Sequence, residues 1–131
     1  MTGRVHAAEV STTTDVPESG NNTETVIATL AGIIPEMASQ PIALSFDGVI
    51  ALGASSTGGT FRIRRGSLTG TQVGENITCT ALATAAGVTA FNGALEDNPG
   101  EGNFTYVLTY QGTGDTGVAT IQNSQFRASW S

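Results

Sequence analysis

Apolar and polar residues alternate with a period of two along much of the chain, and the pattern is clearest in residues 103–112. One face of that segment carries large apolar side chains: Phe104, Tyr106, Leu108 and Tyr110. Residues 59–66 alternate in the same way, with the apolar and the basic side chains on opposite faces: Phe61 and Ile63 against Arg62 and Arg64. Because successive strand residues point to opposite faces of a sheet, both segments are predicted to be half-buried strands.

Further strands are expected where β-branched and apolar residues lie between turn residues. These segments are 24–34, 41–53, 76–84, 87–97, 116–122 and 124–131. The second of them changes phase after Asp47-Gly48, which is typical of either a β-bulge or a hairpin turn. We favour the hairpin at this position.

About eight strands result, separated by Gly, Pro, Asn and Asp at intervals of about 8–12 residues. No segment carries a convincing helical stripe. The pattern predicts an all-β protein: an antiparallel β-sandwich of jelly-roll type that spans residues 24–131. Residues 1–23 are polar and show no sustained period, so they are expected to form an extended N-terminal arm that neighbouring molecules would hold in place.

Composition narrows the functional classes. The 131 residues suit one domain, 12% of them are charged, and all five basic residues are arginine. A net charge of −6 argues against a nucleic-acid partner, because phosphates are neutralised by several basic groups. No run of about 18 apolar residues indicates a membrane span. The single cysteine, Cys79, allows neither an intramolecular disulfide nor a multi-cysteine metal site.

The sequence shows no recognisable catalytic constellation. His6 is the one histidine and lies in the predicted arm, which disfavours a Ser-His-Asp triad, so we do not expect an enzyme. The acidic residues of the loop 96–101, which include Glu96, Asp97 and Glu101, supply oxygen atoms of the kind that bind Ca²⁺. Their spacing is not that of an EF-hand, so a plain acidic loop without metal or other cofactor is expected.

Three stretches carry a resemblance to a known group of proteins: residues 23–33 after the polar arm, 59–74, and 103–129. The last combines a Tyr-rich strand, a Gly-rich turn, a Val/Ala/Thr strand and an ending strand. Together they resemble the small jelly-roll virion proteins of tailed bacteriophages, which include head decoration (cement) proteins and tail or fibre modules with a tumour-necrosis-factor-like sandwich. The resemblance is one of architecture, without a sharp motif.

The resemblance implies a homotrimer on the outer surface of a capsid, where it would bind and bridge subunits of the major capsid protein. The alternative is a tail, fibre or receptor-binding module that recognises carbohydrate. Candidate partner contacts are arm residues, outward arginines and aromatic residues: Arg4, Val5, His6, Arg62, Arg64, Tyr106, Tyr110 and Trp130. The arginines would meet carboxylates of a partner. Buried or subunit-facing aromatic rings would favour assembly, whereas flat exposed rings would favour sugar binding.

Overall fold

The computed structural model describes residues 6–17, 23–52, 58–80, 87–112 and 118–130. The regular elements in these ranges are eight β-strands: β1 (His6–Pro17), β2 (Thr25–Ile33), β3 (Ile42–Leu52), β4 (Gly58–Arg65), β5 (Gln72–Thr80), β6 (Gly87–Asp97), β7 (Phe104–Gly112) and β8 (Val118–Trp130). The described part of the chain has no helix long and apolar enough to cross a membrane.

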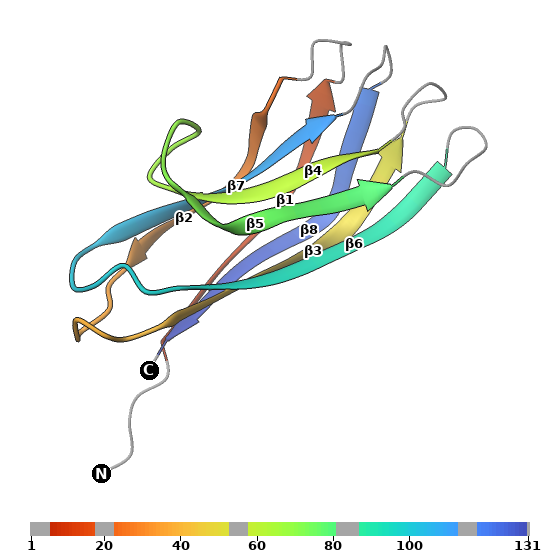
Figure 1. Ribbon diagram of the computed structural model, residues 1–131. Helices are drawn as coiled ribbons and strands as arrows, with labels where there is room; N and C mark the ends of the chain where they lie inside the picture. The colour runs from red at the N-terminus through yellow and green to blue at the C-terminus, as the bar shows by residue number, and fades with distance from the viewer. Residues whose placement is uncertain (1–5, 18–22, 53–57, 81–86, 113–117, 131) are drawn as a thin grey trace.

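The strands form two antiparallel four-stranded sheets that lie face to face (Figure 1). Sheet A has the order β1-β8-β3-β6, and sheet B has the order β2-β7-β4-β5. Every connection except β4–β5 passes from one sheet to the other, so the chain winds around the core. Eight strands in this order are a jelly roll, and the predicted all-β sandwich is confirmed.

The first strand differs from the expected N-terminal arm. Residues 6–17 form β1 at the edge of sheet A, paired with β8 from His6↔Trp130 to Pro17↔Val118. Ala8 and Val10 pack against the core, whereas Glu9 is exposed. The strand therefore does alternate, but its inward side chains are too small to give a strong apolar signal. Residues 1–5 and 18–22 lie outside the described part of the chain.

The phase change at Asp47-Gly48 is a β-bulge, and the favoured hairpin is wrong. β3 pairs with β6 without interruption through this point, while its register against β8 shifts between Asp47 and Val49. A Cβ atom at Gly48 would lie 2.8 Å from the Phe91 ring and 2.9 Å from the Ser124 Cα. The glycine thus serves close packing between neighbouring strands, not a turn.

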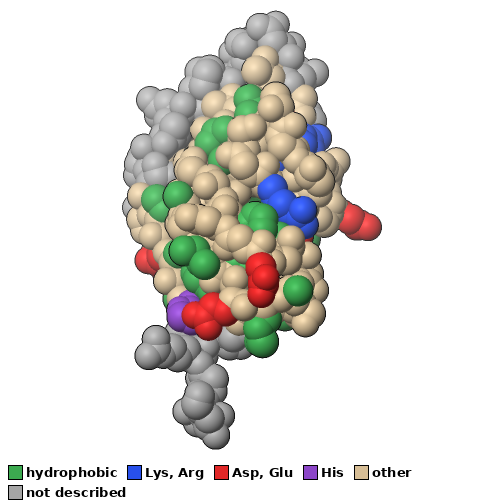
Figure 2. All heavy atoms as spheres, turned by 90° about the vertical axis from the view of Figure 1, so that its left-hand side faces the viewer, with side chains coloured by type: hydrophobic (Ala, Val, Ile, Leu, Met, Phe, Trp, Pro, Cys, Tyr) green, Lys and Arg blue, Asp and Glu red, His purple; other side chains and the backbone are tan. Residues whose placement is uncertain are grey.

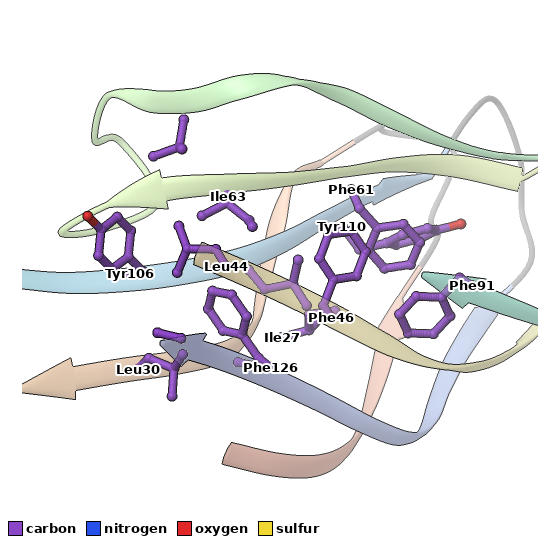
Figure 3. Packing of buried hydrophobic residues seen from close by; sticks show 14 of the residues in the cluster. Ile27, Leu30, Leu44, Phe46, Phe61, Ile63, Phe91, Tyr106, Tyr110 and Phe126 are labelled. Atoms are coloured by element: carbon purple, nitrogen blue, oxygen red, sulfur yellow. The ribbon is translucent and has the colours of Figure 1, made fainter. Parts of the chain in front are cut away.

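Aromatic rings from both sheets meet in the core (Figure 3). The Phe61 ring stacks on Phe91 with 4.4 Å between ring centroids, and it lies 5.0 Å from Tyr110 and 5.4 Å from Phe46. Phe46 and Phe91 belong to sheet A, whereas Phe61 and Tyr110 belong to sheet B. Burial of Phe61 and Ile63 confirms the predicted inward face of β4.

Candidate functional site

One end of the sandwich has its three connections within the described residues, and we call it the loop end. It comprises the β2–β3, β4–β5 and β6–β7 connections, residues 34–41, 66–71 and 98–103, together with the paired residues His6 and Trp130. This end lies on the left of Figure 1 and faces the viewer in Figure 2. The connections at the opposite end fall mostly outside the described residues.

A buried carboxylate at the loop end links the two sheets. Asp97, the last residue of β6 in sheet A, accepts hydrogen bonds from Arg65 Nε at 2.7 Å and from the Tyr106 hydroxyl at 2.6 Å, both donors belonging to sheet B. Arg65 Nη2 also donates to the second oxygen of Asp97. Burial alone would raise the pKa of Asp97, but the bonds from Arg65 and Tyr106 outweigh it and lower that pKa. Burial and the same carboxylate raise the pKa of Tyr106.

The contacts of Asp97 remove one carboxylate from the possible cation ligands of the acidic loop 96–101. Asp97 turns toward Arg65 and Tyr106, so its carboxylate is not available to a cation beside the exposed Glu96 and Glu101. Across the described residues, no group of three His, Cys, Asp or Glu side chains is placed to hold a metal ion. Cys79 lies in β5, but its side chain is outside the description.

A second carboxylate connects the strands on the outer face of sheet B. Glu24 accepts hydrogen bonds from Arg64 Nε at 2.7 Å and Nη2 at 2.9 Å, from Arg62 Nη1 at 3.3 Å, and from the Thr109 hydroxyl at 2.6 Å. The hydrogen bond from Arg64 lowers the pKa of Glu24 against the opposing effect of burial. Arg62 further donates to the side chains of Asn76 and Gln111.

The predicted outward face of Arg62 and Arg64 is therefore correct, and their carboxylate is found within the chain. Both side chains bond to Glu24 rather than standing free for a partner's acidic groups. The sequence reasoning missed Glu24, which lies 38 residues from Arg62 and 40 from Arg64. An isolated Glu at the start of a predicted strand offers no signal of that pairing.

Arg127 of β8 joins three strands on the outer face of sheet A. Its Nε donates to Glu9 of β1 at 2.8 Å, and its Nη1 donates to Asp47 of β3 at 2.6 Å. Both pairs are solvent-exposed, so each contributes little stability. Each of the arginines in the described part of the chain is thus paired with a carboxylate of the same chain: Arg62, Arg64, Arg65 and Arg127.

Trp130 closes the core at the loop end. Its indole Nε1 donates to the Ile34 carbonyl at 3.1 Å, and its ring stacks on His6 with centroids 5.4 Å apart. His6 Nε2 lies 3.6 Å from Glu36 Oε1. Trp130 is 8% exposed and His6 is half-buried. A partner contact through these two residues stays a prediction.

The remaining predicted partner contacts are two tyrosines of β7 and two residues near the N-terminus. Tyr106 and Tyr110 are completely buried, because β7 directs them between the sheets (Figure 3). Neither ring has surface to offer a partner, so the contact prediction is wrong for both. They also form no exposed platform on which a sugar could stack. Arg4 and Val5 lie outside the described residues.

The lowered pKa values predict acid sensitivity. Folding lowers the pKa of Glu24 and of Asp97 from the ordinary values of 4.5 and 3.8. The ionised carboxylates therefore stabilise the folded chain at pH values above those ordinary pKa values. That stabilisation is lost as the pH falls through the lowered pKa values of the folded chain. The urea midpoint should therefore be lower at pH 3 than at pH 6, and in Glu24→Gln the difference should be smaller. Equal pH dependence in the variant and the parent would contradict a role for Glu24.

Comparisons with known proteins address the fold. No family model matches the sequence, and no curated protein matches it. A chain in the structure of infectious bursal disease virus, Gx strain, is similar with a TM-score of 0.58 and 10% identity, over 96% of this chain and 32% of that one. The crystal structure of the infectious bursal disease virus VP2 subviral particle gives 0.46 and 11%, over 97% and 37%.

The enzymatically active domain of bacteriophage CBA120 tailspike protein 4 gives a TM-score of 0.38 and 16% identity, over 93% of this chain and 19% of that one. The TM-scores of the VP2 particle and of this tailspike domain both lie below 0.5 and do not establish a shared fold. This chain spans about a third of the length of the first two matched chains. The first match supports the strand arrangement described above. The chain is therefore a jelly-roll β-sandwich similar in fold to part of a chain in that virus structure.

Proposed function

We propose that this protein is a structural component of a virus particle, and specifically a capsid decoration (cement) protein. In this role it binds the outer surface of the shell and bridges neighbouring subunits of the major capsid protein. One observation carries the proposal: nearly the whole sandwich, 96% of the chain, has the fold of part of a chain from a virus structure.

The side-chain arrangement supports a mechanical role. The Asp97 contacts join the two sheets, and the contacts of Glu24 and Arg127 each join strands within one sheet. Every buried side-chain polar atom in the described residues has a hydrogen-bond partner. A sandwich connected in this way is a stiff body, and a stiff body bound to two capsid subunits resists their separation.

The proposed bridging needs only modest contacts. The chain has 6689 Å² of accessible surface, and a stable protein interface takes about 800 Å² from each partner. One copy therefore has surface for several neighbours. Contacts that are individually weak become strong in combination when one body holds several sites of a lattice. A homotrimer, as the bacteriophage resemblance implies, multiplies these contacts again.

Cryo-electron microscopy of native particles that contain this chain tests the proposal, with particles that lack it as the control. We expect density for the sandwich on the outer shell, in contact with at least two subunits of the major capsid protein. Light scattering of the isolated protein should give three times the 13.3 kDa mass of one chain. Density at a tail or fibre would support the alternative module instead. Absence of the chain from every particle would overturn a virion role.

A further inference from the structure

The loop end exposes apolar side chains. Across the described residues, the exposed large hydrophobic residues are Ile34, Met37 and Leu68, at 50%, 58% and 38% exposure. Ile34 and Met37 belong to the β2–β3 connection and Leu68 to the β4–β5 connection, so all three lie at the same end. Figure 2 shows apolar side chains distributed over this end. Several exposed apolar residues gathered at one end indicate an interaction surface.

Hydrogen bonds order the backbone of the β2–β3 connection, which carries Ile34 and Met37. In the β2–β3 connection, the side-chain oxygen of the buried Gln40 accepts a hydrogen bond from the backbone N–H of Glu36 at 2.7 Å. The backbone N–H of Gln40 donates to the Met37 carbonyl at 3.2 Å. The Trp130 indole fixes the Ile34 carbonyl. A connection whose backbone is already ordered loses less conformational entropy when it binds.

Among the described residues, the exposed charges at this end that lack a partner of opposite charge are acidic. Glu36, Glu96 and Glu101 are exposed on or beside its connections, and Figure 2 shows carboxylates among the apolar side chains. The described arginine at this end, Arg65, is paired with Asp97. Glu36 lies 3.6 Å from His6 Nε2, so Glu96 and Glu101 carry the accessible unpaired charge of the described loop end, and that charge is negative. Such a surface disfavours polyanionic partners such as nucleic acid and anionic membranes.

We propose that the loop end is the docking surface for a different protein, one that presents an apolar patch flanked by Lys or Arg. A second copy of this chain fits poorly, because two loop ends would bring like charges together. The arginines that another described face of a second copy would offer are already paired with carboxylates of their own chain. The partner must therefore supply the positive charge.

This inference rests on the proposed function and adds the face through which the sandwich would attach. The occupant is then a basic, partly apolar region of the shell protein. Hydrophobic contact supplies most of the affinity in such an arrangement, and the carboxylates supply orientation.

Hydroxyl-radical footprinting of the unmodified protein tests the assignment. Oxidation of Ile34, Met37 and Leu68 is followed by mass spectrometry in the isolated protein and in native particles. We expect Met37 to be oxidised about tenfold more slowly in the particle, as for a side chain buried at an interface centre. Val26 and Val49, on strands away from the connections, serve as internal controls and should change by less than about twofold.

Charge substitutions provide the second measurement. In co-sedimentation with particles that lack the chain, the double variant Met37→Glu/Leu68→Glu should bind at least about tenfold more weakly. The matched control Ala90→Glu adds a carboxylate at an exposed position of β6 and should bind within about twofold of the parent. Thermal unfolding of each variant checks that the fold is retained. Replacing Glu36 and Glu101 by Lys should also weaken binding and reduce its dependence on salt.

The outcomes separate the two proposals. Protection of Met37 together with selective loss of binding in the double variant supports the docking surface. A chain bound to particles with Met37 unprotected overturns the docking surface and leaves the virion role intact. Protection of Met37 by another copy, seen as a chain-to-chain cross-link from the loop end, overturns the heterologous partner. Absence of the chain from particles overturns both proposals.

Discussion

Replacing Phe61 by alanine should lower the free energy of unfolding by about 3–5 kcal/mol, the usual loss for a fully buried phenylalanine. Phe61 is completely buried and contacts rings from both sheets: Phe46, Phe91 and Tyr110. Its removal leaves a cavity between the sheets that the neighbouring rings cannot fill, because each is held by its own strand. Equilibrium unfolding in urea, followed by tryptophan fluorescence, measures the loss.

Two further variants serve as controls for the Phe61→Ala measurement. Phe61→Leu keeps most of the volume and should lose clearly less stability than Phe61→Ala. Leu68→Ala removes an exposed apolar side chain and should change stability by no more than about 0.5 kcal/mol. A loss below about 1 kcal/mol in Phe61→Ala would contradict a tightly packed ring cluster.

Replacing Asp97 by alanine should destabilise the protein by about 2–3 kcal/mol. The substitution leaves the completely buried Tyr106 hydroxyl without its acceptor and separates Arg65 from its carboxylate. The Arg65 side chain is 37% exposed and can still reach water, so the loss stays below that of a fully buried ion pair. Urea unfolding at pH 7, where the carboxylate is ionised, gives the difference.

A double-mutant cycle separates the contributions to this contact. Tyr106→Phe alone removes one hydrogen bond and should cost about 1 kcal/mol. In the Asp97→Ala background the same change removes an orphaned hydroxyl, so it should be neutral or stabilising. Additive effects of the two substitutions would show that Tyr106 and Asp97 do not interact in solution.

The strand pattern was readable from sequence wherever large side chains mark the inward face. β4 and β7 are such strands, because phenylalanine, isoleucine and tyrosine alternate there with polar residues. The alternation of β1 is weak in the sequence because its inward positions include Ala8 and Val10, whose side chains are short. A segment with such small apolar residues among polar ones is typical of a linker as well as of a strand. The bulge at Gly48 was open to two readings, since a phase change alone does not tell whether the chain turns back.

The charged contacts were much harder to predict. The outward face of Arg62 and Arg64 follows from alternation, but the identity of their partner depends on strand order. β2 and β4 are both neighbours of β7, which brings Glu24 within reach of the arginines. Arg65 and Asp97 meet because the two sheets are stacked. No local sequence pattern indicates which strands become neighbours when they are 30–40 residues apart. The Glu24 and Asp97 contacts can therefore be identified only in the folded structure.

The place of β8 in sheet A has a consequence for how the chain folds. β8 is the last strand described, yet it lies between β1 and β3, the first and third along the chain. Before residues 118–130 are available, β1 lacks its pairing partner and β3 pairs on one side only. Sheet A therefore cannot close from its N-terminal part alone. Folding should be a slow, all-or-none event of milliseconds to seconds, as for other β-topologies dominated by distant pairings.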